Sequence, residues 1–249
     1  MINKLLSGQH VGSKENQRDV FYQIFDKSFS NLTHFYSANQ HVDSLEVKKN
    51  IDVVKKYLNI EKLAFIKQEH TDIVQYVDDA YTTKVGDALV TDKKNIALCI
   101  KTADCVCVMM VSIDAKVIAC AHLGWKGAAS DLLSNTISMM RKFSKSPIKA
   151  VICPCIRMDS YEVKEDFVTN FQTLKPESKA FFKTVNSKIF FDLPSFVKHE
   201  FKTYNIIDIV DEEVDTYTSE KYFSYRYMKH NNYSQKLINK RILSCVYSL

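Results

Sequence analysis

Several features that mark common classes of protein are missing from this chain of 249 residues. No apolar run approaches the ~20 residues that a membrane-spanning helix needs. The net charge of +5 is not gathered into a basic stripe or a run of like charge. We therefore expect neither a membrane nor a nucleic acid among the partners of this protein.

Signs of secretion are missing as well. No secretory hydrophobic segment follows residues 1–4, and the number of cysteines, seven, is odd. Both observations favour reduced thiols in the cytoplasm over a disulfide framework.

The chain also lacks the familiar catalytic motifs. It contains no G-x-x-x-x-G-K-[ST], G-x-G-x-x-G, H-E-x-x-H or G-x-S-x-G. The H-x-E…P-C-x-x-C pattern of cytidine-type zinc deaminases is absent too, so any deamination must use a different scaffold.

What is present suffices for a substantial core, since 46% of the residues are hydrophobic and 12% aromatic. Strand-like segments alternate with helical patterns, and several strands are joined by links too short for parallel crossovers. The pattern predicts an α/β fold, a single domain with a mixed β-sheet flanked by helices. Residues 19–249 are predicted to form this domain, and the polar residues 1–18, with Gly8 and Gly12, a flexible lead-in.

The expected elements follow from the spacing of apolar residues. Strands are expected at 20–25, 32–37, 63–67, 73–77, 88–90, 149–153, 188–191, 206–210, 222–225 and 241–247. Helices are expected after an Asp43/Glu46 capping box and at 128–143, 165–174 and 194–204.

The stretch 95–130 stands out from the rest. It holds four cysteines and the only tryptophan, and it has the pattern strand, polar break, strand, turn, strand, glycine corner. Cys105 follows the polar break, and His122 ends the last apolar run. Because strands hold residues in place while their end loops leave room for a substrate, this stretch is predicted to form the active centre.

Three residues could act together: His70, Cys105 and His122. Imidazole and thiolate are ligands that zinc favours, and three protein ligands leave a fourth position for water or substrate. The same trio without metal would make a cysteine nucleophile with a histidine base. Spacing alone leaves both interpretations open.

Short sequence motifs around these residues carry a resemblance. They are Q-E-H-T-D-I-V at 68–74, D-A-L-V-T at 87–91, T-A-D-C at 102–105, H-L-G-W-K-G at 122–127, Y-E-V at 161–163, F-D-L at 191–193, F-S-Y-R at 223–226 and Arg241. In this order they resemble the laccase-domain family, first described as multicopper polyphenol oxidases and since reassigned as zinc-dependent purine nucleoside enzymes.

The resemblance implies a laccase-domain, cysteine hydrolase-like fold and maps the family's metal ligands onto His70, Cys105 and His122. It implies phosphorolysis of adenosine, inosine, guanosine and methylthioadenosine, and hydrolytic deamination of adenosine. Purine nucleosides and phosphate would then be the partners, and Zn²⁺ the cofactor. Arg226 and Arg241 are the candidates for holding phosphate, since the planar guanidinium suits that anion.

The chain also departs from the family's pattern. The family's F-x-T-R-x-G-G segment has neither its arginine nor its glycines at residues 35–40. The G-P-x-I-G loop is C-P-C-I-R at 153–157, Lys164 follows Y-E-V in place of glycine, and a Cys-Thr-Tyr becomes Asp-Thr-Tyr at 215–217. Pocket shape and substrate preference are therefore open.

Alternatives remain for several residues. Met109 and Met110 near a His₂Cys set suggest a blue-copper centre. However, no His-x-His pair exists and seven histidines are too few for a multicopper cluster, so a copper polyphenol oxidase is disfavoured. Asp104 could orient a ligand or cap its loop, and Trp125 could stack on a purine or close the core. The main alternatives to a zinc enzyme are a metal-free cysteine hydrolase and a non-catalytic binding module. The other cysteines of interest are expected in the core: Cys107, Cys120, Cys153 and Cys155.

Overall fold

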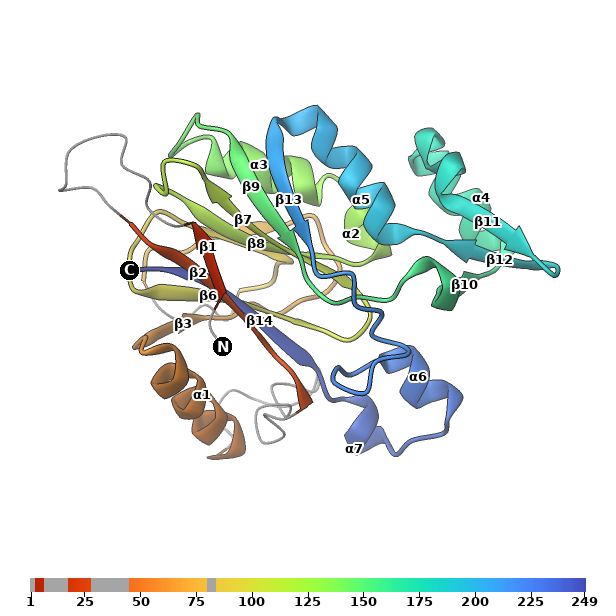
Figure 1. Ribbon diagram of the computed structural model, residues 1–249, viewed down its shortest axis with the longest axis horizontal. Helices are drawn as coiled ribbons and strands as arrows, with labels where there is room; N and C mark the ends of the chain where they lie inside the picture. Colours follow the sequence, from red (N-terminus) through yellow and green to blue (C-terminus); the bar gives the residue numbers. More distant parts are fainter. Residues whose placement is uncertain (1–2, 7–17, 28–44, 80–83) are drawn as a thin grey trace.

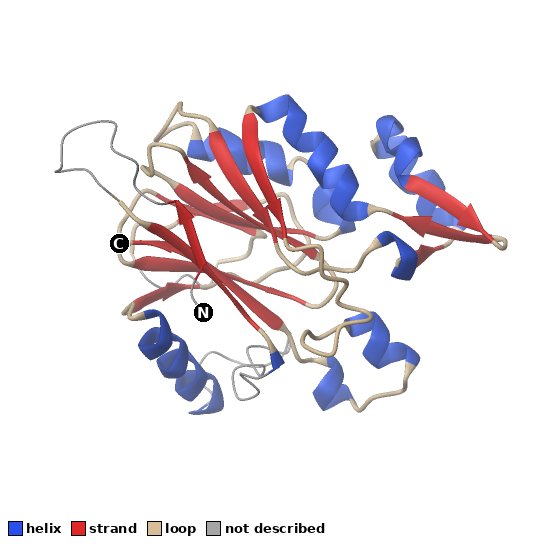
Figure 2. Cartoon of the chain, in the orientation of Figure 1, coloured by secondary structure: helices blue, strands red, loops and turns tan. Residues whose placement is uncertain are grey.

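Two β-sheets that pack face to face form the centre of the protein, and helices cover both outer faces (Figure 1). The computed structural model describes residues 3–6, 18–27, 45–79 and 84–249. The predicted mixed α/β architecture is confirmed. It contains three sheets, however, where the sequence predicted one (Figure 2).

The first sheet has five strands and joins both ends of the described chain. Its order is β1 (Asn3–Leu6), β2 (Val20–Phe25), β14 (Ile242–Ser248), β6 (Ile96–Thr102) and β3 (Lys62–Ala64). All neighbours are antiparallel except β3, which runs parallel to β6. Strand β1 lies within the predicted lead-in 1–18, so part of that segment pairs with the sheet.

The second sheet has six strands and carries the centre of the sequence. Its order is β13 (Ile206–Asp211), β9 (Ile148–Ile152), β7 (Val106–Ser112), β8 (Ile118–Leu123), β5 (Ala88–Thr91) and β4 (Val74–Tyr76). The two outermost pairs are parallel and the inner ones antiparallel. The prediction of a mixed sheet is thus confirmed.

Strand β7 shows why the layers form. Val106, Val108 and Met110 face the helices outside the six-stranded sheet. The residues between them, such as Cys107 and Met109, face the five-stranded sheet. Successive side chains of a strand point to opposite faces, so a continuous apolar run requires cover on both sides.

The helices complete the outer layers. Helix α1 (Leu45–Leu58) packs on the five-stranded sheet through Ile51, Val54 and Leu58. Helices α3 (Leu132–Met140) and α5 (Leu193–Phe201) cover the six-stranded sheet. The remaining helices are α2 (Trp125–Ala129), α4 (Glu165–Leu174), α6 (Tyr225–His230) and α7 (Gln235–Ile238), with short 3₁₀ turns at Met158–Ser160, Pro176–Phe181 and Lys202–Tyr204. Among the described helices, none is long and apolar enough to cross a bilayer.

A small lobe projects from one end of the main body (Figure 1). Its antiparallel sheet has the order β10 (Glu162–Val163), β12 (Lys188–Phe191) and β11 (Phe182–Val185). A cluster of aromatic rings around Phe171 and Phe191 packs this sheet against α4 and α5. The lobe matters because it supplies one wall of the cleft described below.

Two predicted elements are wrong. The helix expected at 128–143 is broken at Ser130, whose hydroxyl donates to the carbonyl of Gly127 at 3.0 Å and so competes with the helical bonds. The strand expected at 222–225 is a bend followed by α6. There the Ser224 hydroxyl accepts from the Tyr227 amide at 3.0 Å and caps the helix. The strand expected at 32–37 and the capping residue Asp43 lie outside the described residues.

A half-buried ion-pair cluster fixes the end of β13. Arg157 donates two hydrogen bonds to the carboxylate of Asp211, at 2.6 and 3.0 Å, and Lys198 adds a third at 2.9 Å. Burial alone would raise the pKa of Asp211. The bonds from Arg157 and Lys198 outweigh it and lower the pKa from 3.8 to about 2.

A carboxylate whose pKa is lower in the folded than in the unfolded state stabilises the fold at pH values above its unfolded-state pKa. It loses that contribution as the pH falls through its folded-state pKa. Asp211→Asn should therefore lower the free energy of unfolding by about 2 kcal/mol at pH 7. The difference in this free energy between the variant and wild type should become smaller between pH 4 and pH 2. Urea unfolding across this range measures it. The control is Asp208→Asn on the same strand, whose partner is Lys149 and whose side chain is 50% exposed; it should change stability little. Equal losses in both variants would contradict the assignment.

Candidate active site

The structure brings His70, Cys105 and His122 together at one end of the two main sheets. One ligand atom from each side chain lies within 4.8 Å of the other two. His70 lies in the turn between β3 and β4, Cys105 in the break between β6 and β7, and His122 near the end of β8. The rings of the two histidines meet edge to face, with centroids 4.8 Å apart.

A buried carboxylate, Asp87, orients both histidines. Its Oδ1 lies 2.8 Å from Nδ1 of His122, which leaves Nε2 of that ring for the trio. Its Oδ2 accepts from the amide and the hydroxyl of Thr71, at 2.7 and 2.9 Å, and from the amide of Glu69. These donors flank His70, whose φ of 59° lies in the left-handed region.

The charges within the trio favour a thiolate. Burial by itself raises the pKa of Cys105, but the adjacent His122 and His70 outweigh it and bring the pKa to about 6. Burial also lowers the pKa of His122, while Cys105 and Asp87 raise it to about 9. Cys105 is therefore ionised at neutral pH, which both a metal ligand and a nucleophile require.

Gly124 leaves the space in which the trio meets. A Cβ at this position would lie 3.0 Å from Sγ of Cys105 and 3.1 Å from Cδ2 of His70. Gly127 is restricted in the same way, because a Cβ there would lie 3.0 Å from the carbonyl oxygen of His122. Close backbone approach thus accounts for both glycines of the H-L-G-W-K-G motif.

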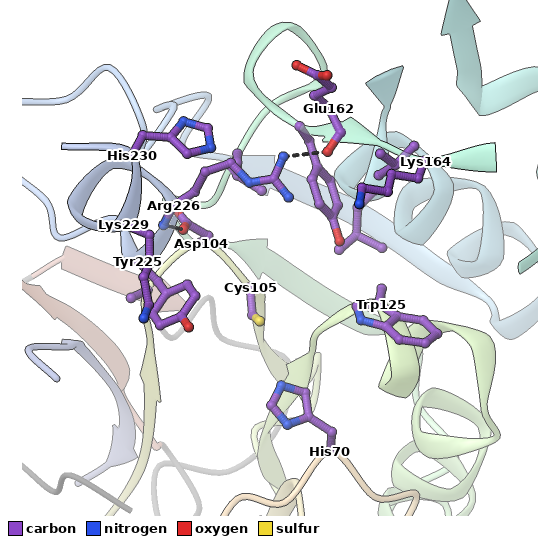
Figure 3. Close-up of a pocket in the computed structure, with 15 residues that line it drawn as sticks. His70, Asp104, Cys105, Trp125, Glu162, Lys164, Tyr225, Arg226, Lys229 and His230 are labelled. Carbon is purple, nitrogen blue, oxygen red and sulfur yellow. Dashed lines mark hydrogen bonds between the residues drawn. The ribbon is translucent and has the colours of Figure 1, made fainter. Parts of the chain in front are cut away.

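Two members of the trio, His70 and Cys105, open into a cleft of about 580 Å³, a size typical of small-molecule sites. Figure 3 shows this cleft. His70 and Cys105 lie at its floor, and Trp125 stands beside them. The walls combine aromatic and cationic side chains, namely Tyr161, Tyr225, Lys164, Arg226 and Lys229, with Asp104 and His230 among the other lining residues.

The two candidate arginines are placed differently. Arg226 lines the cleft, stacks over the ring of Tyr161 at 5.0 Å and donates to the carbonyl of Glu162. Arg241 is not among the lining residues of the described chain. It is half-buried, and its Nη1 donates to the carbonyls of Ile238 and Lys240 at 2.8 Å each. Burial lowers the pKa of Arg241, while the nearby Cys105 thiolate raises it, so the two groups are close enough to interact.

Residues outside the trio fall where their surroundings dictate. The four cysteines expected in the core are fully buried: Cys107, Cys120, Cys153 and Cys155. Trp125 both lines the cleft, where it is available to a ligand, and packs edge to face on Phe167. The sequence analysis gave no role to Asp87, although it begins the D-A-L-V-T motif, because its partners lie 16 and 35 residues away.

Comparison with known proteins agrees with this geometry. The family described as multi-copper polyphenol oxidoreductase laccase matches residues 29–235. The chain belongs to that family. Solved structures share the fold: a Neisseria meningitidis protein superimposes with a TM-score of 0.74 at 22% identity, covering 94% of this chain and 95% of that one. YlmD from Geobacillus stearothermophilus gives a TM-score of 0.73 at 20% identity, covering 98% of each chain.

Sequence relatives carry a name that refers to purine nucleosides. A purine nucleoside phosphorylase of Rickettsia prowazekii is 34% identical over 236 residues, which cover 92% of this chain and 96% of the relative. A purine nucleoside phosphorylase of Clostridium acetobutylicum is 30% identical over 226 residues, covering 86% and 92%. The resemblance read from the motifs is thereby confirmed, and this family member is an enzyme of that kind.

The role of Asp87 leads to a prediction. In Asp87→Asn an amide N–H₂ would meet the donors of Thr71 or the ring of His122, so the affinity of the trio for an added metal ion, with zinc as the probe, should fall by about 10- to 100-fold. Competition with a chromophoric chelator measures it. Asp92→Asn is the control, because Asp92 follows the other end of β5 and bonds Tyr76 instead. An unchanged affinity in Asp87→Asn would show that this carboxylate does not orient the ligands.

The space at Gly124 leads to a second prediction. Gly124→Ala should weaken the binding of added zinc, used as the probe metal, by about 10-fold or more, since neither Cys105 nor His70 can yield to the new methyl group without moving away from the rest of the trio. The control is Lys126→Ala, an exposed change in the same corner. Zinc affinity and thermal melting should be measured together. Wild-type affinity in Gly124→Ala would rule out the close approach as a constraint on the site.

Proposed function

We propose that this protein is a zinc-dependent purine nucleoside phosphorylase that also deaminates adenosine. The observation that carries the proposal is the convergence of His70, Cys105 and His122, of which His70 and Cys105 line the floor of a cleft of about 580 Å³. The relatives named purine nucleoside phosphorylase support the substrate class. Adenosine, inosine, guanosine and methylthioadenosine are the proposed substrates, and the cytoplasm the proposed location.

The residues at the floor suit zinc. Two imidazoles and one thiolate are borderline-soft donors of the kind that zinc prefers, and three of them leave an open position. Asp87 fixes the ring of His122 from behind, as is usual for histidine ligands of metals. When bound, zinc supplies a Lewis acid that can polarise a substrate atom or make a water molecule acidic at neutral pH.

The walls suit a purine nucleoside and an anion. Trp125, Tyr161 and Tyr225 offer aromatic faces and edges for a flat base. Arg226 offers a guanidinium to phosphate within the cleft, and Arg241 adds a positive charge close enough to Cys105 to interact with it.

The two proposed reactions place different demands on these residues. In phosphorolysis a phosphate oxygen bonds to C1′ of the sugar while the bond from C1′ to N9 breaks, and the base leaves with its electron pair and takes up a proton. Here the chain must hold phosphate beside the sugar, and Arg226 is placed to do so. In deamination a water oxygen bonds to C6 of adenine and ammonia leaves. This step needs the base held over the floor of the cleft.

A second candidate function rests on Cys105 itself. Its lowered pKa of about 6 and its partner His122 are the features of an activated cysteine nucleophile. A metal-free cysteine hydrolase would use the same residues, with His122 as the base. Zinc content separates the two functions, since only the first loses activity when the metal is removed.

The proposal predicts that purified protein holds about one zinc per chain and converts inosine and phosphate into hypoxanthine and ribose 1-phosphate. Cys105→Ala and His122→Ala should each lose zinc and at least about 100-fold in rate. Cys245→Ala is the matched control, because that thiol is buried in another part of the core. Full activity in protein stripped of zinc would overturn the zinc assignment and leave the cysteine hydrolase. Equal product release by wild type and Cys105→Ala would overturn both.

A further inference from the structure

Asp104 occupies an unusual position beside the trio. It precedes Cys105, lines the cleft and is only 9% exposed. Its φ of 87° lies in the left-handed region, which is costly for a residue with a Cβ. Strained backbone of this kind persists when surrounding contacts enforce it, and it is concentrated at functional sites.

The contacts that enforce it come from three separate segments. Oδ1 accepts from the hydroxyl of Thr216 at 2.7 Å, and Oδ2 accepts from the amide of Arg226 at 2.7 Å. The carbonyl oxygen of Asp104 accepts from the amide of Ile156 at 2.9 Å. The loop after β9, the segment after β13 and the first turn of α6 therefore all attach to this one residue.

The bond to Arg226 matters for the cleft. The Asp104 carboxylate accepts from the main-chain amide of Arg226 and so fixes the point from which the Arg226 side chain extends into the cleft (Figure 3). The guanidinium lies over the ring of Tyr161. Among the described residues the guanidinium has no carboxylate partner, and the hydrogen bond seen for it is to the carbonyl of Glu162. An arginine that lines a cleft in this way has donors left for an anionic ligand.

Asp104 is not itself suited to hold the substrate. Each of its oxygens already accepts a short bond from the protein, and a carboxylate repels phosphate. Its contacts instead join the loop that carries Cys105 to the backbone that carries Arg226. The distance between the floor of the cleft and its cationic wall is thus set through one side chain.

We infer that Asp104 is a positioning residue, which holds Arg226 where it binds the phosphate substrate opposite Cys105. The inference rests on the proposed function for the identity of the anion. It adds to that function a residue that acts through another and does not touch the substrate. Its effect should appear in phosphate affinity and not in zinc content.

Two variants at this position form a matched pair. Gly and Asn both tolerate the left-handed backbone, so neither adds strain, but only Asn keeps an oxygen for the amide of Arg226. Asp104→Gly should weaken the binding of inorganic phosphate by about 10-fold, whereas Asp104→Asn should stay within about 2-fold of wild type. Calorimetric titration with inorganic phosphate measures this without any need for turnover. Zinc content should be unchanged in both.

A double variant tests whether Asp104 acts through Arg226. Arg226→Ala should weaken phosphate binding, and Asp104→Gly/Arg226→Ala should be no weaker than Arg226→Ala alone. Penalties that multiply would overturn the inference. So would wild-type phosphate affinity in Asp104→Gly, or a wild type that binds no phosphate. If Asp104→Gly fails to hold zinc, Thr216→Val takes its place. Thr216→Val removes the hydrogen bond to Oδ1 of Asp104 and should weaken phosphate binding several-fold. Unchanged phosphate binding in this variant would overturn the inference.

The outcome is separable from that of the proposed function. If wild type turns over no nucleoside but phosphate binding responds to Asp104 and Arg226 as expected, the proposed reaction fails and the positioning role stands. If nucleosides are turned over but the Asp104 variants bind phosphate like wild type, the proposed reaction stands and the positioning role fails.

Discussion

The site depends most on the hydrogen bonds that the carboxylate of Asp87 accepts. This carboxylate is fully buried, and a buried charge is tolerated only when its oxygens are well bonded. Here the donors are the ring of His122 and the backbone and hydroxyl around His70, at the point where that turn enters the left-handed region. One acid thus ties a histidine of the turn between β3 and β4 and a histidine near the end of β8 to strand β5. The third member of the trio, Cys105, comes close to them because Gly124 has no side chain to block it.

The positions at which the chain departs from its family lie against one another. Asp215, in place of a cysteine, accepts from the Ser160 hydroxyl at 2.5 Å and from the amides of Arg157 and Tyr217. Arg157, in place of a glycine, makes its two-bond pair with Asp211. Each of these polar side chains therefore finds its own hydrogen-bond partners, and Asp215 also holds the backbone of the loop at Arg157. The departing segment at 35–40 lies outside the described residues.

The parts of the fold that the sequence predicted are those governed by local pattern. The strands of the central stretch and the helix at 165–174 were predicted correctly. A short continuous apolar run marks a strand that is buried on both faces, and the helical spacing of apolar residues marks the face of the helix that packs. Strands β10 and β11 were missed because they are short and largely exposed, so no apolar pattern marks them. The trio could be found from its motifs. The bonds of Asp104 to Thr216 and Arg226 could not, since 112 and 122 residues separate the partners and only the folded chain brings them together.

The floor and the outer wall of the cleft are held in place by different kinds of contact. Its floor lies at strand ends within two large sheets, held by ladders of backbone bonds and by Asp87. Its outer wall comes from the small lobe and α6, which attach through side chains: aromatic packing of Phe167 on Trp125 and Tyr161, and the bonds to Asp104. Single residues of a wall that is attached by side chains can be substituted without moving the three residues of the trio. This division explains how Lys164 can stand in the cleft where the family pattern has glycine, while His70, Cys105 and His122 keep their arrangement.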